Sequence, residues 1–200
     1  MKIEMITLRE LRMRLKTPFE TSFGVTQERR ILLVELAADG VSGWGEITSL
    51  ESPLFNSETT DTAWHVISDY IAPVLIGKEV STATELPALL AGFRGHEMAK
   101  AGVENALWDA EARQKEVPLH TLLGGSRREI ACGVSLGIRE TPQQLVVKVR
   151  EELESGYQRI KLKVKPGRTW LSSPRSGRSS LKSCSRLTPT APTNSRTPPT

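Results

Sequence analysis

Hydrophobic and polar positions first follow the spacing of β-strands. Residues 2–15 alternate loosely, and residues 30–38 form an apolar run rich in β-formers. Asp39-Gly40 comes next, a pair typical of two-residue hairpin turns, and residues 41–46 can return as the partner strand. The first 50 residues therefore predict a small antiparallel sheet.

Helical spacing follows the sheet. A segment opening at Asn56 places Trp64, Ile67 and Ile71 about one turn apart and stops at Pro73, which predicts an amphipathic helix. A shorter helix fits residues 81–92. Two later helical segments are expected, one from Gly95 with an apolar stripe at Ala99, Val103, Ala106, Leu107 and Ala110, and a short turn over 118–123 closed by Gly124-Gly125.

After residue 125 the pattern changes to strand, helix and strand. Residues 130–138 are strand-like, and Thr141 begins a helix in a capping-box arrangement that ends at Gly156. Residues 159–165 are the next strand. This order predicts one right-handed βαβ unit. Because a single unit cannot bury both faces of its sheet, we interpret it as the opening of a larger α/β domain.

From Arg168 the composition no longer suits a folded segment. Ser, Thr, Pro and Arg make up 24 of the last 33 residues, and no strand or helix period remains. We therefore expect residues 168–200 to be a disordered tail. The tail contains five Arg, one Lys and no acidic residue, so it supplies +6 to the formal net charge of +4. The basic character belongs to the tail, and we do not expect a nucleic-acid partner.

The tail has two interpretations. It is either a natural low-complexity segment or the product of a frameshift in the coding sequence. Moving the reading frame back by one base through residues 188–197 gives codons that can encode Asp-Ala-Asn-Ser-Ala-Tyr and further residues usual in folded proteins. We favour the frameshift hypothesis, which places the change shortly after Gly167.

Cysteine count and terminal composition suit a cytoplasmic protein. The two cysteines, Cys132 and Cys184, form no disulfide framework. The first residues have no signal-peptide pattern, and no apolar run is long enough to cross a membrane. We expect Cys132 to be a small core residue and not a nucleophile.

The strand over 159–165 carries the clearest candidate chemistry. Lys161 and Lys163 alternate with apolar residues, so their side chains share one face. Two ammonium groups enclosed on one face repel each other, and desolvation adds to that effect, which together favour a neutral amine. A lysine in that state can act as a base near neutral pH. The other interpretation is a solvated strand with exposed lysines.

Several phrases in residues 1–167 resemble the enolase superfamily, and within it the o-succinylbenzoate synthase / N-acylamino acid racemase group. The resemblance is carried by Pro18–Gly24 (PFETSFG), Gly43–Glu46 (GWGE), Gly95–Lys100 (GHEMAK), Trp108–Ala110 (WDA), Cys132–Ile138 (CGVSLGI) and Lys161–Lys163 (KLK). The Asp-Ala-Asn-Ser-Ala-Tyr phrase of the shifted frame is similar to the group's third barrel strand, whose Asp is a metal ligand.

The resemblance implies an α+β capping domain over residues 1–125, followed by the start of a (β/α)7β TIM-like barrel. Residues 126–167 would be its first βαβ unit, and the barrel would be incomplete in this chain. About six of the eight strands that such a barrel needs are missing from the sequence. Two strands and one helix leave apolar edges uncovered. We therefore expect the chain as printed to be catalytically inactive.

The resemblance also implies a mechanism. In the family, Mg²⁺ held by three carboxylates binds the substrate carboxylate and stabilises the enediolate formed when the α-proton is removed. Lys163 would act as the acid/base, and Lys161 would favour its neutral form and help to hold charge. The carboxylate ligands of the metal are absent from this chain, so no metal-binding residue is assigned.

Other residues are candidates with a structural alternative. Ser135 is assigned to the substrate pocket or to strand packing. Thr21, Phe23 and Phe55 lie in segments that resemble specificity loops, and ordinary loop packing explains them equally well. We expect structural roles for Glu46 and Asp109, and surface or structural roles for His65, His96 and His120.

Three functions remain open at this point. The preferred family function is o-succinylbenzoate synthase, a dehydration that serves menaquinone biosynthesis. N-acylamino acid racemase is the enzymatic alternative, and a non-catalytic capping-domain module is the third. Expected partners are a small carboxylate substrate and, for full-length relatives, further copies of the same chain; no membrane partner is expected.

Overall fold

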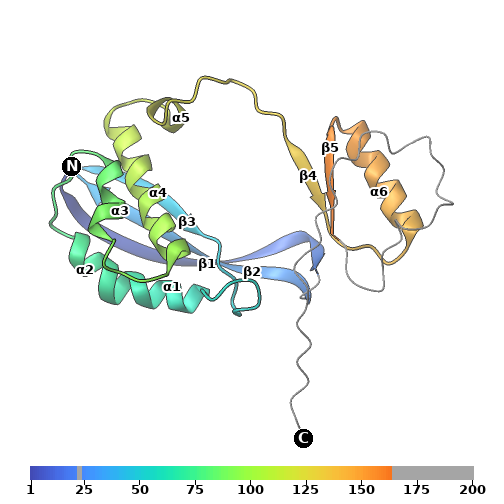
Figure 1. The fold of residues 1–200 in the computed structure, drawn as a ribbon, viewed down its shortest axis with the longest axis horizontal. Coiled ribbons are helices and arrows are strands. Elements are labelled where there is room, and N and C mark those ends of the chain that lie inside the picture. Colours follow the sequence, from blue (N-terminus) through green and yellow to red (C-terminus); the bar gives the residue numbers. More distant parts are fainter. Residues whose placement is uncertain (22–23, 164–200) are drawn as a thin grey trace, which may run out of the picture. The chain divides into compact units, whose positions relative to one another are not determined.

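The computed structural model describes residues 1–21 and 24–163 (Figure 1). The described chain forms two compact units. The first contains residues 1–15 and 28–128, and the second contains residues 16–27 together with residues from 129 onward. Phe23, the end of the predicted strand 159–165 and the predicted tail 168–200 lie outside the described residues.

A three-stranded sheet, apart from the part of its first two strands that lies within residues 16–27, forms the base of the first unit. Its strands are β1 (Ile3–Thr21), β2 (Gly24–Ala38) and β3 (Val41–Ile47), in the order β1-β2-β3. β2 and β3 pair antiparallel from Leu32↔Ile47 to Ala38↔Val41. Asp39 and Gly40 both have positive φ, 46° and 79°, as a tight turn of this kind requires. The predicted hairpin is confirmed.

β1 is longer than the predicted 2–15. It continues through Pro18 to Thr21. Because β1 is an edge strand, Pro18 can lack an N–H group without breaking the hydrogen-bonded ladder of a central strand.

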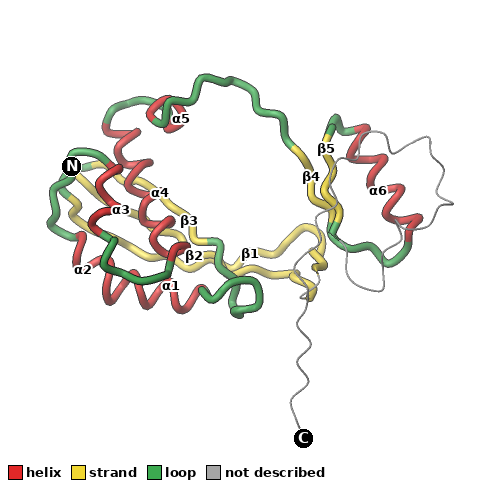
Figure 2. Tube along the Cα trace, in the orientation of Figure 1, coloured by secondary structure: helices red, strands yellow, loops and turns green. Residues whose placement is uncertain are grey.

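Eight helical elements lie in the described residues, and the seven of the first unit cover one face of the sheet or follow it directly (Figures 1 and 2). In the first unit they are α1 (Thr60–Val66), the π-helical turn η1 (Ile67–Ile71), α2 (Ala72–Leu75), the 3₁₀ turn η2 (Ala83–Glu85), α3 (Leu86–Leu89), α4 (Glu97–Gln114) and α5 (Leu119–Leu122). Among the described residues, no helix has the length and apolarity needed to cross a membrane.

The first predicted helix differs from the observed one in three ways. It begins at Thr60 instead of Asn56, because Thr59 is the N-cap and accepts a hydrogen bond from the Thr62 N–H. It continues past Pro73, since the π-helical turn changes the hydrogen-bond register and Pro73 occupies an initial position of α2, where no N–H is required.

The third difference concerns the core face of that helix. Trp64 lies at helical spacing from Ile67 and Ile71, as predicted, but it is 41% exposed and does not share their buried face. Ala63 lies there instead, together with Ile67 and Ile71, which are fully buried.

The stripe predicted for α4 is confirmed. All five of its members are fully buried: Ala99, Val103, Ala106, Leu107 and Ala110. Three glycines allow α4 to lie very close to β3. A Cβ at Gly43 would overlap the backbone of Ala106 and Ala110, and one at Gly45 would overlap the carbonyl oxygen of Gly102. Helix and strand therefore pack backbone against backbone.

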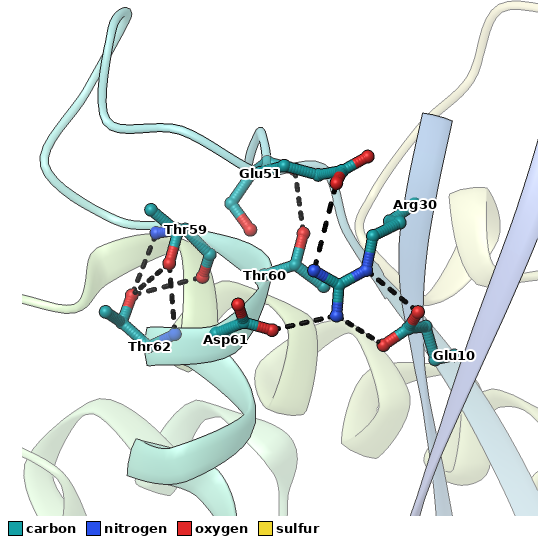
Figure 3. A network of polar contacts seen from close by, with 8 residues as sticks. Glu10, Arg30, Glu51, Thr59, Thr60, Asp61 and Thr62 are labelled. Atoms are coloured by element: carbon teal, nitrogen blue, oxygen red, sulfur yellow. Dashed lines mark hydrogen bonds and ion pairs between the residues drawn. The ribbon is translucent and has the colours of Figure 1, made fainter. Parts of the chain in front are cut away.

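An ion-pair network joins the sheet to α1 and to the loop before it (Figure 3). The Arg30 guanidinium donates to both carboxylate oxygens of Glu10 at 2.8 and 2.7 Å and to Asp61 at 2.8 Å. Glu51 lies 3.9 Å from the same guanidinium. The hydrogen bonds to Arg30 hold the pKa of Glu10 below its usual value, and they raise the pKa of Arg30.

In the second unit, two parallel strands are joined by a helix. β4 (Gly133–Leu136), α6 (Pro142–Glu154) and β5 (Arg159–Leu162) form it, with register Gly133↔Arg159 to Leu136↔Leu162. The predicted order of strand, helix and strand is confirmed. Leu136, Ile160 and Leu162 form the core of this unit, with Leu145 and Val149 of α6 packed against it.

β4 is shorter than the predicted 130–138. Ile130 is 75% exposed, and Cys132 is exposed and donates from Sγ to the Ile130 carbonyl oxygen at 3.4 Å. The prediction that Cys132 is a core residue is therefore wrong, because the strand begins only at Gly133 and no buried face reaches back to Cys132.

Candidate functional site

Ser135, Lys161 and Lys163 lie on the same face of the β4–β5 pair. Ser135 and Lys161 are direct register partners, and both are exposed. The Lys163 N–H donates to the Leu136 carbonyl oxygen at 3.1 Å, which continues the parallel ladder one step beyond β5. Their neighbours Leu136 and Leu162 point to the opposite face, into the core with α6. The structure thus brings three predicted site residues together.

The face is positively charged. Arg159 and Lys161 alternate along β5, and Lys163 follows at the same spacing one residue beyond it, so three cations lie on one side. Such a face suits an anionic group, for example a substrate carboxylate. Lys161 is exposed and Lys163 is half-buried. Proton transfer by an amine would in addition require a cavity around it.

The segment before Thr21 lies against the carboxyl end of β4. The Ile138 N–H donates to the Glu20 carbonyl oxygen at 3.2 Å. A Cβ at Gly137 would lie 3.4 Å from the Glu20 backbone, so the two segments are in close contact. Thr21 follows at once, and its Oγ1 donates to the Gly24 carbonyl oxygen at 3.3 Å. Thr21 and the lysines therefore belong to the same compact unit.

Phe55 belongs to the first unit. It lies on the loop between β3 and α1, where its side chain is 71% exposed and that of its neighbour Leu54 is 61% exposed. We call residues 50–59 the α1 loop. This loop is held by residues that the sequence analysis did not single out.

Glu58 anchors the α1 loop to α4. Its carboxylate accepts the Met98 N–H at 2.9 and 3.1 Å and the Ala99 N–H at 3.0 Å. His96, the N-cap residue of α4, makes no capping hydrogen bond with its side chain. Glu58 therefore caps α4 from a distant part of the sequence. A long-range cap leaves no pattern within the helix sequence, which is why spacing alone could not reveal it.

The remaining candidates have structural contacts. Asp109 accepts the Trp44 N–H and the Arg113 Nε, each at 2.9 Å, and so ties α4 to β3. Glu46 is exposed on β3. The histidines lie apart: His65 pairs with Asp69 at 3.0 Å and His120 contacts Thr121 Oγ1 at 3.3 Å.

The part of the chain that the structure describes does not fit a metal site of the expected kind. Over residues 1–21 and 24–163, no group of three or more His, Cys, Asp or Glu side chains is placed to hold a metal ion. In the printed sequence no Asp or Glu follows Glu154. The carboxylates that the resemblance assigns to later strands are therefore not among residues 155–200.

Comparison with known proteins identifies a family and close relatives. Residues 2–124 match the family described as mandelate racemase / muconate lactonizing enzyme, N-terminal domain. The chain is 44% identical over 166 residues to an o-succinylbenzoate synthase from Geobacillus kaustophilus, covering 82% of this chain and 44% of the relative. It is 43% identical over 167 residues to an N-succinylamino acid racemase from Amycolatopsis, covering 84% of this chain and 45% of the relative.

Solved structures of the enolase superfamily are also similar to this chain. A member of the enolase superfamily from Listeria innocua superimposes with a TM-score of 0.78 at 31% identity, covering 82% of this chain and 45% of that one. The chain therefore spans somewhat less than half the length of the relatives that it matches.

Proposed function

Because this chain belongs to the mandelate racemase / muconate lactonizing enzyme family of the enolase superfamily, we propose that its family activity is that of an o-succinylbenzoate synthase. In this reaction a proton α to a carboxylate is removed and a β-hydroxyl group leaves as water. The observation that carries the proposal is the cationic face of β5, where Lys161 and Lys163 lie beside Ser135 in a chain 44% identical to such a synthase.

The roles of the site residues are part of the proposal. Lys163 takes the α-proton and can return it as an acid, while Lys161 favours the neutral amine of Lys163 and binds negative charge. Ser135 contacts the substrate from the paired position on β4, which the register Ser135↔Lys161 supports.

Thr21 is a further proposed substrate contact. It follows Glu20, whose carbonyl oxygen accepts a hydrogen bond from the end of β4. Phe23 and Phe55 are proposed as substrate contacts on the resemblance of their segments alone.

The metal requirement limits what this chain can do. The family reaction uses Mg²⁺ as a Lewis acid for the substrate carboxylate, and the described residues do not fit that ion. We therefore propose that the 200-residue chain does not turn over substrate. We further propose that residues 1–125 are the capping domain, residues 126–167 the first βαβ unit of the barrel, and residues 168–200 an out-of-frame segment.

N-acylamino acid racemase is the second candidate. The 43% identity to an N-succinylamino acid racemase supports it almost as well as the synthase match supports the first. Both reactions begin with removal of an α-proton by the same lysine pair. They differ in whether a β-hydroxyl leaves or a proton returns to the opposite face. For either activity we propose a small carboxylate substrate, a cytoplasmic protein and a homo-oligomeric full-length form.

A pair of assays tests the proposal. The gene is resequenced through the codons for residues 166–200 and beyond. Two proteins are then purified: the 200-residue chain and the frame-restored chain, which is translated after the reading frame has been corrected. Each is supplied with Mg²⁺ and either the synthase substrate or an N-succinylamino acid. We expect synthase turnover from the frame-restored chain and none from the printed one.

Other outcomes separate the alternatives. Racemisation without dehydration would favour the racemase. A stable printed chain that captures a partner, with no turnover after the frame is restored, would favour a non-catalytic module.

A further inference from the structure

The α1 loop is closed at its base. The Thr60 N–H donates to the Leu50 carbonyl oxygen at 3.1 Å, and Leu50 also forms a parallel bridge with Thr59. The two ends of the loop are therefore hydrogen-bonded to each other. Such a closed loop has few conformations open to it, because its ends cannot separate.

The far side of the loop is attached to the first turn of α4. The Glu58 carboxylate accepts the N–H groups of Met98 and Ala99, the second and third residues of the helix. These are the groups that an N-cap side chain ordinarily satisfies. The negative charge also lies at the positive end of the helix dipole.

Asn56 adds a second link between the loop and the same turn. Its Oδ1 accepts the Glu58 N–H at 2.5 Å, and its Nδ2 donates to the Met98 Sδ at 2.9 Å. Glu58 is 7% exposed, so its carboxylate is buried, and it accepts hydrogen bonds there from two backbone N–H groups. Between the closed base and these anchors, Leu54 and Phe55 are held outward, 61% and 71% exposed.

We propose that Glu58 is a positioning residue. By binding the amino end of α4, its carboxylate fixes the α1 loop in one conformation and thereby sets where Leu54 and Phe55 are presented. The fixed loop removes an entropic cost from any later contact with an apolar group. If the proposed function holds, the group that Leu54 and Phe55 contact is the apolar part of the substrate, and this step rests on the proposed function. The ordering of the loop by Glu58 does not depend on the proposed function.

The test uses the 200-residue chain without substrate. Chymotrypsin cleaves after exposed Leu and Phe when the backbone can open, so cleavage at Leu54 and Phe55 measures loop opening. Rates are followed by mass spectrometry over a urea series for wild type, Glu58→Ala and Glu58→Gln. Glu51→Gln is the matched control, because Glu51 is a carboxylate of the same loop that lies 3.9 Å from Arg30. The amide proton shifts of Met98 and Ala99 are recorded by NMR for each variant.

We expect the rate of cleavage at Leu54 and Phe55 in Glu58→Ala to rise at least about tenfold without urea. This rate should depend little on the urea concentration, because a local opening exposes little surface. Glu58→Gln keeps one acceptor oxygen and should recover part of the protection. The amide signals of Met98 and Ala99 should move in both Glu58 variants and stay in place in Glu51→Gln.

A cleavage rate in Glu58→Ala equal to that of the control would overturn the proposal. So would a rise that follows the same urea dependence as global unfolding, since Glu58 would then act only on stability. If Glu58→Ala does not fold, Glu58→Gln carries the test, because it keeps the side-chain volume and removes the charge at the α4 amino end; a cleavage rate equal to that of Glu51→Gln would then overturn the proposal. Absence of turnover in the enzyme assays would overturn the proposed function and leave this result unchanged.

Discussion

The close approach of α4 to β3 predicts that Gly45→Ala strongly destabilises the first unit. A Cβ at Gly45 would overlap the Gly102 carbonyl oxygen and lie 2.9 Å from the Ala106 nitrogen. Neither obstacle is the end of a flexible side chain; both are helix backbone. The strain can be relieved only by moving α4 away from the strand.

The magnitude follows from the packing. Restoring ordinary contact distances requires α4 to move by about 1.5 Å. The buried stripe of α4 moves with it because interiors are close-packed. Overpacking of a well-packed core costs about 1–3 kcal/mol. The upper end applies here, because the obstacle is rigid backbone. For a unit of this size, about 3 kcal/mol corresponds to a fall in Tm on the order of 10 °C.

The assay is urea and thermal unfolding followed by far-UV circular dichroism. Gly92→Ala is the matched control, since a Cβ at Gly92 meets nothing within 4 Å. We expect the control to lie within about 0.5 kcal/mol of wild type, as for an ordinary surface substitution. If Gly45→Ala were no less stable than Gly92→Ala, the backbone contact between α4 and β3 could not be as close as described.

Three further predictions concern the buried carboxylate, the second unit and the lysine pair. Burial raises the pKa of Glu111, but hydrogen bonds from Lys115 and from the Ala83 N–H outweigh it and leave the pKa below 4.5. Folding therefore favours the charged form of Glu111. Glu111→Gln should lower the free energy of unfolding by about 2 kcal/mol at pH 7. The difference between variant and wild type should shrink as the pH falls below about 4.5, because the carboxylate is then protonated. Leu136 is 3% exposed, so Leu136→Ala should lower the free energy of unfolding of the second unit by about 3 kcal/mol. Amide hydrogen exchange should become faster in β4 and β5 but not in α4. Val147 is 52% exposed, so the control Val147→Ala should change neither quantity. In a frame-restored chain, Lys163→Ala should lower kcat by about 10³-fold with circular dichroism unchanged; retention of kcat would rule out Lys163 as the acid/base.

The sequence is enough to predict those turns, helices and strands whose formation depends on residues close together in the chain. The Asp39-Gly40 turn needs positive φ at both positions, and this requirement is visible in the dipeptide itself. The stripe of α4 follows from its 3.6-residue period, and all its predicted members are buried. The strand–helix–strand order of the second unit was visible for the same reason.

The errors arise where distant contacts decide. Nothing in the order of Asn56 to Thr62 shows that Glu58 serves a helix beginning at Glu97, so the segment was assigned to the start of its own helix. Trp64 fits the period as well as Ala63 does, and only packing selects between them. For the site, alternation placed Lys161 and Lys163 on one face, but the contact of Glu20 with Ile138 joins segments far apart in sequence and could not be derived from spacing.

The two units differ in how far they can support themselves, and this bears on the proposed function. Among the described residues, the core of the first unit contains twenty buried side chains, whereas the core of the second contains three. A core of three residues cannot offset the conformational entropy of ordering two strands and a helix. The cationic face of β5 therefore needs packing beyond what the described residues of the second unit provide, whereas the first unit does not. A stable first unit is thus expected whether the chain is an enzyme remnant or a binding module, so stability alone cannot decide between them. Turnover by a frame-restored chain can, because the proposed reaction requires Lys163 to be held in a closed barrel.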